Sequence, residues 1–213
     1  GAMEAIRTAG GVGVPTIKPW NQELVFEKLD LARTSGCKAV AMDIDGAGLP
    51  FLKNMTPPAG SKSVQELSEI IRYAGMPFIV KGVMTAEGAL KCADAGCAGI
   101  IVSTHGGRVI TSAQSTAEVL PEIRAAVGDR LTVIVDGGIR TGYDIFKVLA
   151  LGADAAMIGR PFVVAAVGGS ALGSGAEGVE LYANTKRAEL ENLMIMTNSR
   201  TIGDITASKI SLR

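Results

Sequence analysis

The stretch TVIVDGGIRTGYDIFKVLALGADAAMIGRP, residues 132–161, decides the fold. It opens with an apolar run at 132–135, passes through a glycine-rich turn into an amphipathic segment at 142–150, and reaches a second apolar run at 155–158. Short runs rich in valine and isoleucine are typical of parallel strands that are buried on both faces. A helix between two such strands makes a βαβ unit, so this stretch predicts one.

The same alternation extends through the chain. We expect strands at 13–17, 39–44, 78–80, 99–102, 132–135 and 155–158, and helices at 23–32, 64–73, 86–95, 116–127, 142–150 and 178–196. Ser63, Thr85 and Ser115 stand where N-caps belong. Gly36, Gly75, Gly96, Gly128 and Gly152 follow predicted helices, where a left-handed residue ends the helix. Residues 55–63 and 168–175 read as loops. The chain therefore contains about six βα units.

Strict alternation implies a parallel sheet, which is either an open doubly wound sheet or part of a (β/α)8 barrel. Each chemically suggestive residue follows the carboxyl end of a predicted strand. A barrel gathers these ends around one mouth, whereas an open sheet spreads them along a line. We therefore favour an α/β fold of the TIM (β/α)8 type. Eight units typically need about 250 residues, so six units predict an incomplete barrel.

Composition narrows the classes of function. The 213 residues include 21 basic and 21 acidic side chains, so we expect neither nucleic acid nor a membrane as partner. No apolar run is long enough to span a bilayer and no signal peptide opens the chain, which makes the cytoplasm the expected compartment. Cys37, Cys92 and Cys97 lack metal-type spacing and are expected to be buried thiols; we predict no metal.

Two glycine turns predict a phosphate site. They comprise Asp136, Gly137, Gly138 and Arg140 in the first turn, and Gly159 with Arg160 in the second. Each turn follows a predicted strand and is expected to open a helix. Glycine allows backbone N–H groups to approach an anion, and arginine can donate two hydrogen bonds to phosphate oxygens. Barrels often bind phosphate after their last two strands. The alternative is that tight βα turns contain glycine for purely structural reasons.

His105 is the only histidine in the chain and lies in Ser103-Thr104-His105-Gly106-Gly107-Arg108. Imidazole can accept a proton near neutral pH, and a nearby guanidinium can hold a carboxylate. These residues predict a base with an anionic substrate, although a lone histidine can also be structural.

Lys81 and two aspartates complete the candidate site. A lysine at the end of a buried strand needs an anionic or electron-rich partner, unless it extends out to solvent. Asp43 and Asp45 alternate along their strand, so both lie on one face and one could orient His105. The alternative is that these aspartates fix a loop.

With these residues laid out, the chain resembles the FMN-dependent α-hydroxy-acid oxidases and dehydrogenases, the family of glycolate oxidase and lactate oxidase. The resemblance rests on the segments VKGVMTAEGAL, IIVSTHGGR, VLPEI, VIVDGGIRTGYDIFKVLALGA and IGRPF, in this order. PTIKPW and MDIDGAGLPFLKNMTPPAGSKS resemble a bacterial subgroup. The family oxidises a 2-hydroxy acid to a 2-oxo acid and passes the hydride equivalent to flavin N5.

The resemblance assigns roles to individual residues. It makes His105 the general base, Asp45 the carboxylate that steadies the imidazolium, and Arg108 the group that holds the substrate carboxylate. Lys81 would lie beside flavin N1 and the C2 carbonyl. Ser103, His105 and Gly106 are also expected to contact FMN. The resemblance further implies that the ribityl and phosphate groups of FMN are bound by Asp136, Gly137, Gly138, Arg140, Gly159 and Arg160.

The chain departs from the family at several positions. Thr104, Ile110 and Thr111 replace an asparagine, a leucine and an aspartate of the family motif. Lys18 stands in place of a flavin-contacting glutamine, Trp20 in place of a substrate-binding tyrosine, and Asp43 in place of a threonine. Lys18, Trp20 and Asp43 fit the subgroup and indicate a different substrate or electron acceptor, with Trp20 as a substrate-binding residue.

The expected organisation is an expression-tag remnant at residues 1–3 and a single FMN-binding barrel domain at 4–213, in which the family's first two strands have no counterpart before Gly13. An open sheet edge favours pairing with another chain, so we expect a homo-oligomer. The leading hypothesis is oxidation of a small 2-hydroxy acid. One alternative is a truncated barrel that binds FMN or another phosphorylated ligand without catalysis. The other is a chain in which two copies pair their open sheet edges and any function is incidental.

Overall fold

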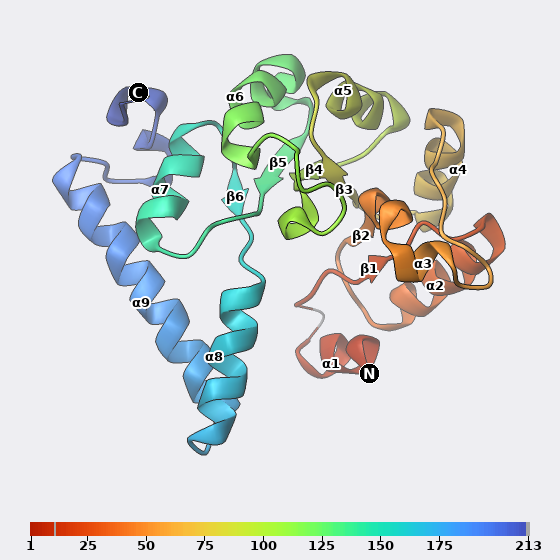
Figure 1. The fold of residues 1–213 in the computed structure, drawn as a ribbon, viewed down its shortest axis with the longest axis horizontal. Coiled ribbons are helices and arrows are strands. Elements are labelled where there is room, and N and C mark those ends of the chain that lie inside the picture. Colours follow the sequence, from red (N-terminus) through yellow and green to blue (C-terminus); the bar gives the residue numbers. More distant parts are fainter. Residues whose placement is uncertain (11, 212–213) are drawn as a thin grey trace. The chain divides into compact units, whose positions relative to one another are not determined.

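The computed structural model describes residues 1–10 and 12–211. It contains six parallel strands, which follow one another in the order β1-β2-β3-β4-β5-β6. The strands are β1 (Thr16–Ile17), β2 (Val40–Asp43), β3 (Phe78–Val83), β4 (Gly99–Val102), β5 (Thr132–Val135) and β6 (Ala155–Ala156). Every expected strand is present, and the prediction of six βα units is confirmed (Figure 1).

The principal helices are α1 (Ala2–Thr8), α2 (Gln22–Thr34), α3 (Pro50–Lys53), α4 (Val64–Ala74), α5 (Ala86–Ala95), α6 (Thr116–Val127), α7 (Gly142–Ala150), α8 (Arg160–Ala171) and α9 (Gly175–Met196). Short 3-10 turns include η1 (Ile44–Gly48) and η2 (His105–Gly107). No helix among the described residues combines the length and apolar character that a bilayer span requires.

Two compact units make up the chain, Gly1–Val133 and Ile134–Arg213, and the boundary falls within β5. In the first unit, β1 to β4 pair in parallel with Cα partners such as Ala41 with Ile79 and Val80 with Ile100. Residues of β2 and β4 are buried throughout, because helices cover one face of the sheet and side chains fill the other. The core includes Leu29, Val40, Met42, Ile70, Phe78, Val80, Ile100, Val102, Leu120 and Ile123.

In the second unit, β6 pairs with β5, and α7 packs against α9 over a small apolar core. The core contains Phe146, Leu149, Ala150 and Ile205, with Leu190, Leu193 and Met194 of α9 against them. Helices α8 and α9 lie side by side (Figure 1). A Cβ on Gly169 would approach Gly178 Cα to 2.8 Å, so the absence of side chains there allows the two helices to touch.

The predicted helix caps are confirmed. Ser63 and Ser115 each form a capping box with the glutamate three residues later, and Thr85 Oγ1 accepts a hydrogen bond from Gly88 N–H. Gly75 and Gly96 end α4 and α5 in the left-handed helical conformation. The same expectation is wrong for Gly128, whose ψ of −132° lies outside that conformation. Cys37, Cys92 and Cys97 are free and buried, as expected.

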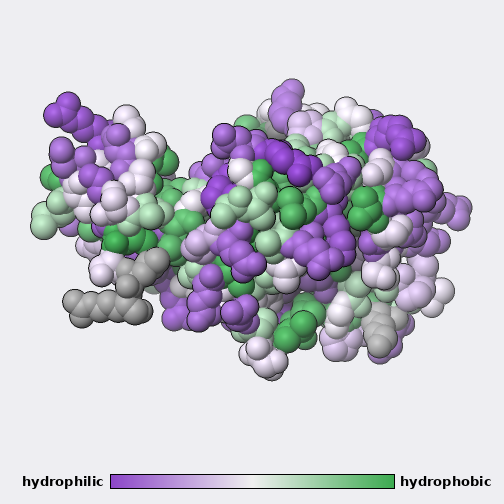
Figure 2. Space-filling view, turned by 90° about the horizontal axis from the view of Figure 1, so that it is seen from above, coloured by the Kyte–Doolittle hydropathy of each residue, from purple (hydrophilic) through white to green (hydrophobic). Residues whose placement is uncertain are grey.

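The prediction of a loop at 168–175 is wrong in its first half, because α8 continues to Ala171. Gly168 and Gly169 suggested a break, but Gly169 is needed for the contact with α9 rather than for a turn. Helices α1 and α3 were not expected from the sequence, whereas the helix that opens at Gly159-Arg160-Pro161 was expected without a predicted range and is α8. Figure 2 shows hydrophobic and hydrophilic residues interspersed on the face that it draws.

Candidate active site

The carboxyl ends of β2, β3 and β4 bring together the chemically suggestive residues of the first unit. Asp43 ends β2 and Asp45 follows it in η1, Lys81 lies in β3, and Ser103 and His105 follow β4. Because neighbouring parallel strands end at the same edge, residues far apart in the sequence meet there.

An imidazole–carboxylate pair lies at the centre of this cluster. His105 Nδ1 is 3.1 Å from Asp45 Oδ2, and the two side chains are 17% and 10% exposed. A carboxylate at Nδ1 fixes the orientation of the ring and leaves the other ring nitrogen for a substrate. The expectation that one of the two aspartates orients His105 agrees with this geometry. The expectation that both lie on one strand face is wrong, because β2 ends at Asp43 and Asp45 lies in η1.

Lys81 and Ser103 join the pair into a network. Lys81 Nζ lies 3.8 Å from Asp45 Oδ2 and donates a hydrogen bond to Ser103 Oγ at 2.9 Å. Ser103 is buried, and its Oγ also accepts from the backbone N–H of His105 at 3.0 Å. The serine thus ties the lysine to the loop that carries the histidine.

The backbone of this loop has a special conformation. His105 has a φ of 55°, and Gly106 and Gly107 follow with φ of 65° and 78°. Non-glycine residues rarely adopt positive φ, and such positions concentrate at functional sites. The left-handed turn places the imidazole over the end of β4.

Gly82 allows Asp45 to approach the network. Its φ is 98°, and a Cβ at this position would lie 2.5 Å from Asp45 Cβ. The register of β3 against β4 shifts between Lys81 and Val83, which is the irregularity that Gly82 permits.

A second charged pair was not predicted from the sequence. Lys18 Nζ, one residue beyond β1, donates a hydrogen bond to Asp43 Oδ2 at 2.5 Å. Asp43 is buried and Lys18 is partly exposed. Both residues lie at the ends of the adjacent strands β1 and β2, which brings them near each other without fixing the pairing.

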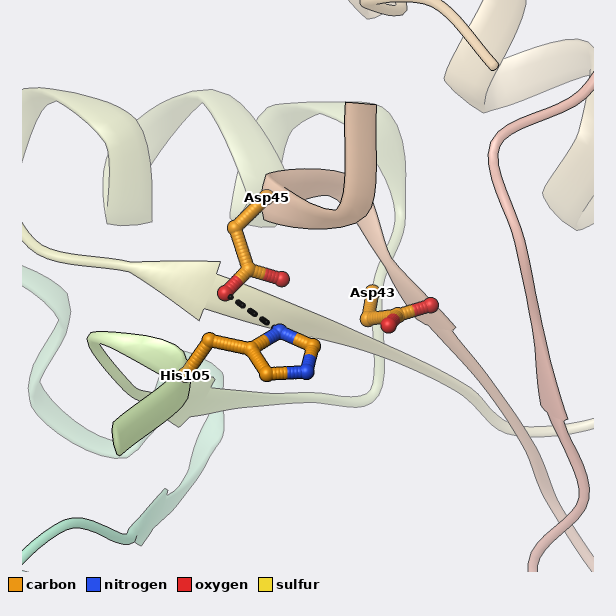
Figure 3. Close-up of side chains that lie close together, drawn as sticks. All are labelled: Asp43, Asp45 and His105. Atoms are coloured by element: carbon orange, nitrogen blue, oxygen red, sulfur yellow. Dashed lines mark hydrogen bonds and ion pairs between the residues drawn. The ribbon is translucent and has the colours of Figure 1, made fainter. Parts of the chain in front are cut away.

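Asp43, Asp45 and His105 lie close together (Figure 3). One carboxylate oxygen from each aspartate and one ring nitrogen of His105 lie within 4.8 Å of one another. These three residues meet the geometric requirement for a metal site. However, Lys18 and Lys81 place two ammonium groups on the same carboxylates, which opposes a divalent cation.

Two other predicted residues lie near the start and end of this region. Trp20 packs against an apolar cluster of Leu49, Leu52 and Ala59 in which Val109 also takes part. Arg108 directly follows η2 and is exposed.

The glycine turns of the second unit differ in how their helices begin. At the first turn, Gly137 and Gly138 have φ of 94° and 76°. The α7 N-terminus is already occupied, because Asp144 accepts from the backbone N–H of Arg140 and of Thr141. Glu189 Oε2 accepts from Gly142 N–H at 2.6 Å.

By contrast, α8 begins at Gly159-Arg160-Pro161 without a side-chain cap. Gly159 and Arg160 are exposed, and a Cβ on Gly159 would meet nothing within 4 Å. Pro161 carries no backbone N–H and the Phe162 N–H donates to Gly159 O, so this turn offers an anion the open space over Gly159 and the exposed Arg160 side chain. Of the two turns, the one before α8 is therefore the better candidate for a phosphate contact.

Comparison with known proteins places the chain in a family. The family model for FMN-dependent dehydrogenase matches residues 51–212. The chain belongs to this family, the FMN-dependent α-hydroxy-acid oxidases and dehydrogenases. It is 42% identical over 166 residues to an L-lactate oxidase of Lactobacillus jensenii, covering 78% of this chain and 40% of that protein. It is 42% identical over 135 residues to a peroxisomal (S)-2-hydroxyacid oxidase of Arabidopsis thaliana, covering 63% and 36%.

Solved structures of the family share the fold. A mandelate oxidase variant with (S)-mandelic acid matches with a TM-score of 0.83 and 28% identity, over 95% of this chain and 64% of that one. A lactate oxidase of Pediococcus acidilactici matches with a TM-score of 0.83 and 31% identity, over 96% and 63%. The fold is therefore TIM-barrel-like, as predicted. The chain spans about two fifths of the length of the lactate oxidase from Lactobacillus jensenii.

Proposed function

We propose that this chain takes part in the FMN-dependent oxidation of a small 2-hydroxy acid to the corresponding 2-oxo acid. The observation that carries the proposal is the hydrogen bond between His105 Nδ1 and Asp45 Oδ2, with the Lys81 ammonium group beside it. These groups supply a base, its counter-ion and a fixed cation within one network.

The residues present fit a flavin and a substrate. Asp45 Oδ1 is buried without a hydrogen-bond partner in the described part of the chain, so the network has an acceptor left for a bound group. Lys81 would lie beside the flavin ring, where a cation favours the reduced, anionic form. Ser103 and Gly106 would contact the ring, and Asp136, Gly137, Gly138, Arg140, Gly159 and Arg160 would hold the ribityl and phosphate groups. FMN, when bound, supplies the acceptor for the two electrons that the substrate loses.

The chain's own residues perform the proton chemistry. Arg108 would bind the substrate carboxylate through its guanidinium, which fixes the 2-hydroxyl carbon near His105. His105 would take a proton from the substrate at its free ring nitrogen. Asp45 would stabilise the imidazolium through Nδ1–H, since its Oδ2 already lies 3.1 Å from that nitrogen. Trp20 would contribute an apolar wall for the substrate side chain.

Flavin reduction tests this proposal. The 213-residue chain is mixed with FMN under anaerobic conditions and titrated with lactate and with glycolate, while the visible absorbance of the flavin is recorded. We expect bleaching with wild type and none with His105→Ala, which should still bind FMN. Failure of the wild-type chain to bind or reduce FMN would overturn the proposal.

The second candidate is a phosphate-ligand binding protein without catalysis. The uncapped start of α8 favours this function, since it does not depend on the His105 network. Saturable FMN binding with no flavin reduction across a panel of 2-hydroxy acids would support it. Cytoplasmic location and assembly into a homo-oligomer stay predictions.

A further inference from the structure

Asp43 is a buried carboxylate that is only half satisfied. It is 2% exposed, and its Oδ2 accepts a hydrogen bond from Lys18 Nζ at 2.5 Å. Its Oδ1 is buried and has no hydrogen-bond partner in the part of the chain that the structure describes. Leaving a buried carboxylate oxygen without a donor is costly. A donor from a bound molecule would remove that cost.

The position of Asp43 shows where a bound molecule that supplies this donor would lie. Asp43 is the Cα partner of Lys81 in the register of β2 and β3. One of its oxygens lies within 4.8 Å of a ring nitrogen of His105, and Figure 3 shows the imidazole between the two carboxylates. Two hydrogen bonds of about 2.8 Å that meet at one atom at a tetrahedral angle span roughly 4.6 Å. A ligand bound against His105 is therefore within reach of Asp43.

Charge determines which ligands benefit. Lys18 donates a hydrogen bond to one oxygen of Asp43, and the second carboxylate oxygen is available as an acceptor. An ammonium or hydroxyl group of the ligand gains a charge-assisted hydrogen bond there, whereas a methyl group leaves the oxygen without a partner. The uncharged glutamine and threonine that stand at these two positions in the named oxidases carry no such charge.

We propose that Asp43, positioned by Lys18, accepts a hydrogen bond from an O–H or N–H group of the ligand bound beside His105, and thereby determines specificity. The inference rests on the proposed function. The donor is either a hydroxyl or ammonium group on C3 of the 2-hydroxy acid, or the ring N–H of the flavin. Each source predicts a different result.

The first experiment measures binding without turnover. Propanoate, 3-hydroxypropanoate and 3-aminopropanoate differ only in the donor on C3 and lack the 2-hydroxyl, so the chain cannot oxidise them. Trp20, the only tryptophan, lies two residues after Lys18 and serves as the fluorescent reporter. With the flavin-free and FMN-loaded chain, we expect the amino acid to bind about tenfold more tightly than propanoate. Asp43→Asn should abolish this preference.

A second variant guards against misfolding. Lys18→Gln/Asp43→Thr replaces both charges with the residues of the named oxidases, so no buried charge is left unpaired. It should bind the three acids with similar affinity and keep the circular dichroism spectrum of wild type. If this folded variant keeps the wild-type preference for the amino acid, Asp43 is not the acceptor.

The flavin arm uses FMN methylated on the ring N–H. If this N–H is the donor, methylation weakens binding to wild type about tenfold, has little effect on Asp43→Asn, and the acids show no donor preference. If wild type prefers the acids that carry a donor on C3, and binds FMN and methylated FMN equally, the donor belongs to the substrate. Absence of both effects overturns the inference, while the proposed function stands if lactate still bleaches FMN. If the chain neither binds nor reduces FMN, the proposed function fails, and the acid series on the flavin-free chain decides the inference alone.

Discussion

At the scale of single residues, the network around His105 depends on the charge of Asp45 and on the small size of Gly82. Asp45 contacts His105 at 3.1 Å and lies 3.8 Å from Lys81, so it serves two cationic partners during the proposed reaction. Its approach depends on the missing side chain of Gly82. Two substitutions separate these contributions.

Asp45→Asn should slow flavin reduction by about 10²–10⁴-fold, because the amide cannot neutralise the imidazolium that forms on His105. The measurement is the anaerobic reduction rate by stopped flow at saturating lactate. Asp94→Asn is the matched control, since this aspartate pairs with Arg130 on the surface. An Asp45→Asn rate equal to that of the control would remove Asp45 from the mechanism.

Gly82→Ala should destabilise the chain by about 2–4 kcal/mol, because it combines a left-handed backbone with an overlap against Asp45. Gly75→Ala is the control. Gly75 also has positive φ, but a Cβ there meets nothing within 4 Å, so the expected cost is only about 1–2 kcal/mol. Urea denaturation of both variants measures the difference. Equal losses would mean that the overlap relaxes without cost.

At the scale of helices and strands, most of the fold could be predicted from the sequence. The bounds of α5, α6, α7, β4 and β5 agree with the expected ranges to the residue, because caps and glycines mark their ends locally. The extent of helix α8 was missed because its glycines signal a loop in isolation. Only the contact with α9 explains Gly169, and that contact is not visible in a local pattern.

The same limit applies to the site. Each residue of the His105 network stands at the end of a predicted strand, so adjacency followed from topology alone. The pairing of Lys18 with Asp43 did not follow, because side-chain direction beyond the end of a strand depends on packing. The occupied N-terminus of α7 likewise involves Glu189, which lies on a different helix.

The contact between α8 and α9 gives a prediction from two adjacent glycines. Gly169→Ala should destabilise the second unit by about 1–3 kcal/mol, since its Cβ would lie 2.5 Å from Ser174 O and 2.8 Å from Gly178 Cα. Gly168→Ala, one position earlier in the same helix, meets nothing within 4 Å and should stabilise it by about 0.5–1 kcal/mol. Thermal denaturation of the two variants should shift in opposite directions.

Asp144 makes the start of α7 sensitive to acid. Burial raises its pKa, but hydrogen bonds from Thr141 and from the backbone N–H groups of Arg140 and Thr141 outweigh this effect, and the net pKa is lowered. Because the folded pKa lies below the unfolded value of about 3.9, the carboxylate stabilises the fold above that pH. The stabilisation is lost as the pH falls through the folded pKa.

Asp144→Ala should therefore cost about 1 kcal/mol at pH 7 and progressively less as the pH falls below about 4. Urea titrations of wild type and variant at several pH values measure the difference. Glu122→Ala, which removes an exposed acid in α6, is the control. A difference between wild type and Asp144→Ala that stays constant down to pH 3 would contradict the assignment.

At the scale of the whole molecule, the proposed cofactor should act as a stabilising ligand. A ligand that binds only the folded state at 100 times its Kd adds about 2.7 kcal/mol of stability. FMN should therefore raise the melting temperature more than riboflavin, which has the same ring but lacks the phosphate.

Differential scanning fluorimetry at matched ligand concentrations checks this expectation. Arg160→Ala should reduce the advantage of FMN over riboflavin, since Arg160 begins the uncapped helix α8. Arg124→Ala is the control: this arginine lies in α6, where its guanidinium donates to Gly128 O, and its loss should leave the advantage of FMN unchanged. Equal stabilisation of wild type by FMN and by riboflavin would show that the phosphate group does not contribute to binding.

The left-handed backbone of His105 also constrains how this loop can change over evolutionary time. Asparagine and aspartate tolerate positive φ far better than β-branched or bulky residues do. A single-nucleotide change can convert a histidine codon into one for asparagine or aspartate. In descendants that lose His105, we therefore expect asparagine or aspartate at this position first. Such proteins should keep the fold and the surrounding site residues, and should still bind a ligand although they no longer carry the base.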